Sequence, residues 1–130
     1  MSNEIALIKN NWLEIAKSAA DLPRPFQNEI FLQECPVAGT LYVDDILEKV
    51  TLADEGKYLQ LKRETDNEYD EFAISVQTAS GEHIGYVPRR YNQVFARLMD
   101  AGKLLIAKFS KIDLKDHWLD INIKIILRDV

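Results

Sequence analysis

The stretch FAISVQTASGEHIGYVP, residues 72–88, carries the pattern that decides the fold. Its first half alternates large apolar residues with small or polar ones, which is the period of a β-strand. The pair Ser80-Gly81 is a turn signal, and the second half is a partner strand that Pro88 ends. The stretch therefore predicts a β-hairpin over residues 72–87.

Three segments on either side of this hairpin also have the strand period. They are YLQLKRE at 58–64, LLIAKFSKI at 104–112 and LDINIKIIL at 119–127. The last segment predicts one fully apolar face, made of Leu119, Ile121, Ile123, Ile125 and Leu127. FLQECPVAGTLYV at 31–43 has strand composition broken by Gly39, and such a glycine marks a bulge, a bend or a close approach.

Helical spacing appears between the hairpin and the last strands, and again at the N-terminus. RRYNQVFARLMDAG, residues 89–102, predicts a helix that stops at Gly102, with Val94, Phe95, Leu98 and Met99 on one apolar face. The N-terminal stripe consists of Ile5, Ile8, Trp12, Ile15 and Ala19. The acidic run at 43–56 is either a loop or a short helix.

These elements predict a mainly β, α+β fold. We expect a small OB-like β-barrel of about six strands with one inserted helix and a helical N-terminal extension. The domain prediction is a helix and proline-containing connector at 1–30, followed by the barrel at 31–130. The N-terminal stripe either packs on its own domain or makes a homo-oligomer contact.

Composition places the chain among globular proteins and limits its function classes. It has 130 residues, of which 47% are hydrophobic and 28% are charged, and its net charge is −5. One cysteine excludes an internal disulfide, and with two histidines it makes a zinc site improbable. No apolar run is long enough for a membrane span, and no secretory signal is recognisable, so a cytoplasmic protein is expected.

The charge is unevenly distributed. Residues 31–70 carry four bases and ten acids, whereas residues 86–130 carry nine bases and five acids. The basic part predicts a strip that could guide a nucleic-acid backbone, made of Arg89, Arg90, Arg97, Lys103, Lys108 and Lys111. The alternative interpretation is that these charges only solvate strand and helix faces.

Motifs for catalysis are missing from the sequence. No glycine-rich phosphate loop and no G-x-S-x-G occurs, and Cys35 in its apolar setting predicts a buried, inert thiol. We expect no catalytic residue, no metal site and no cofactor.

Three short signatures stand out instead: VAGTLY at 37–42, RETDNEYDEFAI at 63–74 and GEHIGYVPR at 81–89. In the middle one, Tyr69 offers a face for stacking on a base or sugar, and Asp70 can accept hydrogen bonds from hydroxyls. Arg89, just after a rigid proline, could meet a phosphate. Each residue also has an ordinary explanation, as a half-buried aromatic, a turn cap or a helix-solvating charge.

Together the three signatures resemble the HIRAN domain family over residues 31–128. The matching positions are Val37, Gly39 and Tyr42, then Arg63, Glu64, Asn67, Tyr69, Asp70, Ala73 and Ile74, then Gly81, Ile84, Gly85, Tyr86, Pro88 and Arg89. The resemblance implies an OB-like barrel that binds single-stranded DNA ends. It also implies partners among helicase-family or other repair proteins.

By position, the resemblance assigns roles in an end-binding pocket. Tyr42 and Tyr69 would stack on the terminal nucleotides, and Asp70 would accept the free 3′-hydroxyl. Asn67 would support the pocket wall, Tyr86 would line it, and Arg89 would meet a phosphate. Arg90 joins the predicted DNA-binding residues as part of the basic strip.

Two alternatives stay open at this point. The first is a protein-interaction or assembly domain that keeps the barrel without binding DNA. Leu41, at a position where an end-binding relative carries arginine, favours it, as do the acidic residues Asp66, Glu68 and Glu71 around the expected pocket. The second is a small hydrolase that uses Asp70 with a metal ion.

Overall fold

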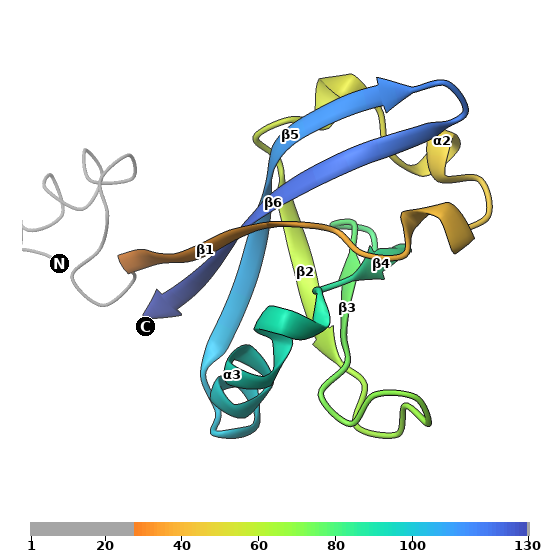
Figure 1. The fold of residues 1–130 in the computed structure, drawn as a ribbon. Coiled ribbons are helices and arrows are strands. Elements are labelled where there is room, and N and C mark those ends of the chain that lie inside the picture. Colours follow the sequence, from red (N-terminus) through yellow and green to blue (C-terminus); the bar gives the residue numbers. More distant parts are fainter. Residues whose placement is uncertain (1–27, 130) are drawn as a thin grey trace, which may run out of the picture. The chain divides into compact units, whose positions relative to one another are not determined.

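The alternating segments form one six-stranded sheet in the computed structural model, which describes residues 28–129 (Figure 1). The strands are β1 (Asn28–Pro36), β2 (Tyr58–Arg63), β3 (Ile74–Gln77), β4 (His83–Tyr86), β5 (Leu104–Lys115) and β6 (Trp118–Asp129). The helical elements are η2 (Thr40–Tyr42), α2 (Ile46–Lys49), η3 (Leu52–Asp54) and α3 (Arg89–Asp100). The predicted N-terminal helix and connector lie outside the described residues, apart from the start of β1.

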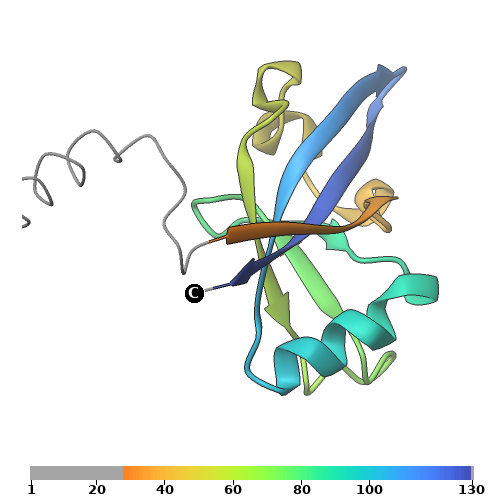
Figure 2. The ribbon, with the colours of Figure 1, turned by 90° about the vertical axis from the view of Figure 1, so that its left-hand side faces the viewer.

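The sheet order is β1-β6-β5-β2-β3-β4. β3 and β4 form the predicted antiparallel hairpin, and β5 and β6 form a second, longer one. Figures 1 and 2 show the sheet curled, with β1 crossing β6 and α3 beside the lower ends of β2 and β3. The mainly β, OB-like architecture predicted from the sequence is confirmed.

The curled sheet closes where the chain leaves β1. The amide of Val37 donates to the Ile121 carbonyl of β6 at 2.8 Å. The next residue, Ala38, exchanges two backbone hydrogen bonds of 2.8 Å with Tyr86 of β4. One dipeptide thus bridges two strands that lie far apart in the sheet order, and it brings the turn after β1 against the end of β4.

The interior is filled by the apolar faces that the alternation predicts. Leu119, Ile121, Ile123 and Ile125 are buried, and Leu127 packs at the margin of the core. The fully buried side chains include Ile74, Val76, Ile84, Leu105, Ile121, Ile123 and Ile125. This core supports both the closure point and the loop that follows β2.

Two details differ from the expectation. The strand predicted for 31–43 ends at Pro36, and Thr40–Tyr42 is a 3₁₀ turn, because Gly39 adopts a left-handed φ of 79° that redirects the chain. On α3, Val94 is 63% exposed, whereas Asn92, Phe95 and Ala96 face inward. The helix is therefore rotated relative to the predicted apolar face.

Segment 43–56 adopts the short-helix alternative, as α2 and η3. Within residues 28–129, no helix is long and apolar enough to cross a membrane.

Candidate functional site

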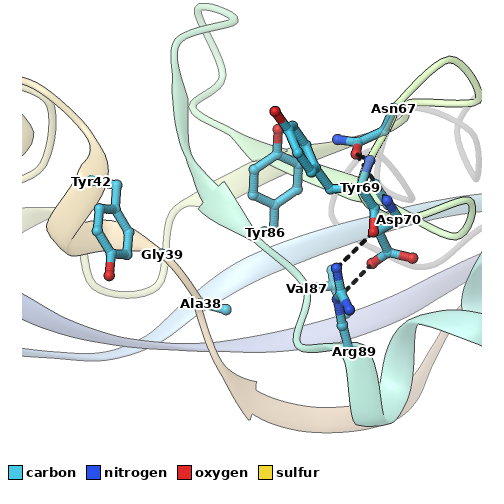
Figure 3. A pocket seen from close by; sticks show the side chains of 10 residues that line it. Ala38, Gly39, Tyr42, Asn67, Tyr69, Asp70, Tyr86, Val87 and Arg89 are labelled. Atoms are coloured by element: carbon cyan, nitrogen blue, oxygen red, sulfur yellow. Dashed lines mark hydrogen bonds and ion pairs between the residues drawn. The ribbon is translucent and has the colours of Figure 1, made fainter.

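A pocket of about 550 Å³ lies where three parts of the chain meet (Figure 3). They are the turn after β1, the loop between β2 and β3, and the junction of β4 with α3. The pocket is lined by Ala38, Gly39, Tyr42, Asn67, Tyr69, Asp70, Ala73, Tyr86, Val87 and Arg89. The closure of the barrel therefore builds one wall of this pocket.

Asn67 shapes the loop that carries Tyr69 and Asp70. Its side-chain oxygen accepts hydrogen bonds from the backbone amides of Tyr69, at 2.8 Å, and of Asp70, at 3.0 Å. Its side-chain amide donates to Glu64 at 3.0 Å. Such an Asx turn fixes the backbone direction locally, so it determines where the next two side chains point. The Tyr69 ring is left 84% exposed.

The Asp70 carboxylate is held on both of its oxygens. Oδ1 accepts the backbone amide of Phe72 at 2.9 Å, and Oδ2 accepts the side-chain amide of Asn92 at 2.8 Å. Arg89 lies on the solvent side of the carboxylate, with its Nε 3.6 Å from Oδ2. A terminal nitrogen of Arg89 also donates to the Tyr69 carbonyl at 2.7 Å. The pocket therefore contains an oriented acceptor with an exposed cation beside it.

Tyr86 contributes a half-buried ring whose hydroxyl donates to Glu64 Oε1 at 2.8 Å. Burial raises the pKa of Tyr86, and the hydrogen bond to the Glu64 carboxylate raises it further. Because the hydroxyl proton is already donated, only the lone pairs of that oxygen remain for a ligand. The floor of the pocket therefore offers acceptors beside apolar surface.

Arg63 holds the end of the loop between β2 and β3 in place. Its side chain is 13% exposed and pairs with Asp100 of α3 at 3.0 Å. The same guanidinium donates to the backbone carbonyls of Ala73, at 2.9 Å, and Glu71, at 3.1 Å. The first residue of the middle signature therefore has a structural role, because it ties the end of the loop to the sheet and to α3.

Six of the seven predicted DNA-binding residues line this one pocket: Tyr42, Asn67, Tyr69, Asp70, Tyr86 and Arg89. Tyr42 is 90% exposed and approaches from the turn after β1, opposite the others (Figure 3). Arg90 does not line the pocket, and its guanidinium lies 4.9 Å from the centre of the Tyr91 ring.

The predicted basic strip is not gathered at the pocket. Arg97 lies over the Phe72 ring at 5.5 Å. Lys108 lies over the Tyr58 ring at 4.8 Å, next to Arg128. Of the strip, Arg89 alone is among the lining residues.

Two residues that hold pocket side chains in place have no role in the sequence prediction. Glu64 belongs to the quoted signature, but no role was assigned to it, although it joins Tyr86 to Asn67. Asn92 stands three residues before Phe95 and therefore on the same helical face. A polar residue at such a position was the available signal.

Within the described residues, no group of three or more histidine, cysteine, aspartate or glutamate side chains could hold a metal ion. Cys35 is 2% exposed, and burial raises the pKa of its thiol to about 11, in agreement with the predicted inert thiol.

The chain is similar to known proteins in both sequence and fold. The family model of the HIRAN domain matches residues 30–128. A crystal structure of a protein from Lactobacillus plantarum is 32% identical, with a TM-score of 0.73, over 80% of this chain and 99% of that chain. The crystal structure of the HIRAN domain of human HLTF is 15% identical, with a TM-score of 0.58, over 78% of this chain and 79% of that chain. At that identity, the human structure shows a shared fold only. No curated protein matches the chain.

Proposed function

The chain belongs to the HIRAN domain family, and we propose that it is a non-enzymatic module that binds single-stranded DNA at a free 3′-hydroxyl end. Membership in this family supports nucleic-acid binding and is consistent with a binding domain rather than a catalyst. The proposed setting is DNA repair or replication-fork processing, with helicase-family or other repair proteins as partners.

The observation that carries the proposal is the held Asp70 carboxylate, which lines the same pocket as the exposed side chains of Tyr42 and Tyr69. An ionised carboxylate only accepts hydrogen bonds, and the hydroxyl proton of Tyr86, which lines the same pocket, is already donated to Glu64. A sugar hydroxyl can donate to such a site. A terminal phosphate at neutral pH is an anion and is repelled by the carboxylate. The pocket chemistry therefore favours a free hydroxyl end over a phosphorylated one.

The two tyrosines supply the other half of the proposed recognition. Tyr42 and Tyr69 expose 90% and 84% of their surface, so both rings are accessible for stacking. Stacking of one base on an aromatic side chain is worth roughly 1–3 kcal/mol and tolerates any base. We therefore assign the terminal nucleotides to these rings, and the first phosphate to Arg89.

The test is fluorescence anisotropy at low salt, with labelled single-stranded oligonucleotides that end in a 3′-hydroxyl or a 3′-phosphate. The wild type should prefer the hydroxyl end, and Asp70→Asn should reduce that preference about tenfold, because one charge-assisted hydrogen bond is lost. Tyr69→Ala should weaken binding to both ends. Asp66→Asn is the matched control, since it removes the same charge from an exposed position of the same loop, outside the pocket lining.

An unchanged preference in Asp70→Asn would show that another group recognises the end. Absence of binding even at low salt would favour the assembly domain instead. The observations on that side are the exposed Leu41, at 65%, and the exposed acidic residues Asp66, Glu68 and Glu71.

A further inference from the structure

Asn92 is a buried amide on an otherwise apolar helix face. It is 2% exposed and stands with Phe95 and Ala96 on the inward side of α3. A buried amide is costly unless it is hydrogen-bonded, and a leucine or alanine at this position would fill the face without that cost. The side-chain amide of Asn92 donates to Asp70 Oδ2 at 2.8 Å. The buried side chain of Asn92 therefore makes this hydrogen bond with the carboxylate in the pocket.

The other two partners of the Asp70 carboxylate are a backbone amide and an exposed arginine side chain. The Phe72 amide on Oδ1 belongs to the backbone of the braced loop. Arg89 is a long side chain with 73% exposure, and its Nε lies 3.6 Å from Oδ2. Under the function proposed above, the same guanidinium also meets a phosphate. When Arg89 turns toward that phosphate, Asn92 is the remaining partner of Oδ2.

We propose that Asn92 is the positioning residue that keeps the Asp70 carboxylate oriented for the 3′-hydroxyl after Arg89 has moved to the phosphate. The proposal rests on the proposed function and deepens it. Without Asn92, the carboxylate rotates toward its cationic neighbour, Arg89, and pairs with it more closely. Asp70 then no longer presents its oxygen to the hydroxyl, and Arg89 is less free for the phosphate.

The experiment measures the ratio of affinities for 3′-hydroxyl and 3′-phosphate oligonucleotides in Asn92→Ala and Asn92→Asp. Asn92→Asp keeps the shape of the side chain but replaces the donor by a second acceptor. Both variants should lower the ratio about tenfold, the size expected for one hydrogen bond to a charged group. Affinity for the phosphate-blocked oligonucleotide should change less than the ratio does.

The matched controls are Gln93→Ala and Gln93→Glu, which make the same chemical changes at the next, exposed position of α3. They should leave the ratio unchanged. Thermal unfolding of each variant sets a temperature at which all of them are folded. If Asn92→Asp does not fold, the affinity ratio of Asn92→Ala alone tests the proposal.

The outcomes separate the inference from the proposed function. A wild type that discriminates, with Asn92 variants that do not, supports the inference. Variants that keep the wild-type ratio, or that lose affinity for both ends equally, assign Asn92 a structural role only and overturn it. A wild type that does not discriminate between the two ends overturns the proposed function, and the inference with it.

Discussion

At the scale of single residues, Gly85 shows how closely the barrel closure is packed. Its φ is +155°, and a Cβ built there would lie 2.5 Å from Val37 Cγ1 and 2.6 Å from the Ala38 carbonyl oxygen. Those two residues carry the backbone hydrogen bonds that close the sheet. Any side chain at Gly85 therefore separates β4 from the chain that follows β1, and with it one wall of the pocket.

We expect Gly85→Ala to lower the free energy of unfolding by about 2–5 kcal/mol, because backbone strain and overpacking add. The measurement is urea denaturation followed by tryptophan fluorescence. Gly81→Ala is the control, since Gly81 also has a positive φ, of 93°, but no atom within 4 Å of the added Cβ. Equal losses in the two variants would mean that the closure tolerates the methyl group.

At the scale of elements, the loop between β2 and β3 depends on Arg63. Lysine at this position keeps the charge but lacks the planar fork that reaches Asp100 and two carbonyls together. In Arg63→Lys, amides at 65–73 should exchange with deuterium faster, on the order of tenfold, since the carbonyls of Ala73 and Glu71 lose the Arg63 donors that hold the end of the loop. The paired amides of β5 and β6 should exchange as before.

Arg90→Lys makes the same change at an exposed position of α3 and should leave the exchange of the loop unaltered. If Arg63→Lys also leaves it unaltered, the Asn67 turn alone holds the loop. In that case Arg63 stabilises only the contact with α3.

At the scale of the whole molecule, an ionic contact joins three strands. Glu29 of β1 accepts from the Tyr58 hydroxyl of β2 at 2.6 Å and from Arg128 of β6 at 2.8 Å. The hydrogen bond from Tyr58, and then that from Arg128, lower the pKa of Glu29 below its ordinary value of 4.5. A lowered pKa in the folded state means that the unfolded chain takes up its proton first as the pH falls.

The contribution of Glu29 to stability is therefore present above pH 4.5 and is lost as the pH falls through the lowered pKa. Glu29→Gln should be less stable than the wild type at pH 7, and this difference should shrink at pH 3. Urea denaturation at the two pH values measures it, with Glu82→Gln in the exposed hairpin turn as the control. A difference that stays constant with pH would show that the contact owes nothing to the charge.

Most of the strands, the hairpin over 72–87 and six residues that line the pocket were predictable from the sequence alone. Alternation in segments such as 72–87 and 119–127 is a local property, because a strand has to bury one face whatever lies across from it. The residues that line the pocket all belong to the three signatures around Tyr42, Asp70 and Arg89.

The remaining features depend on contacts between segments that are far apart in the sequence, so they appear only in the folded chain. Val94 fits an apolar face by spacing, yet α3 turns Asn92 inward, because Asp70, 22 residues earlier, accepts its amide. Glu64 acquires its role only when β4 brings Tyr86 to it. Lys108 and Arg89 belong to one basic third of the sequence, but the curled sheet sends Lys108 to Tyr58 and leaves Arg89 in the pocket. Periodicity records which face a residue occupies, whereas which residues meet across that face depends on the path of the whole chain.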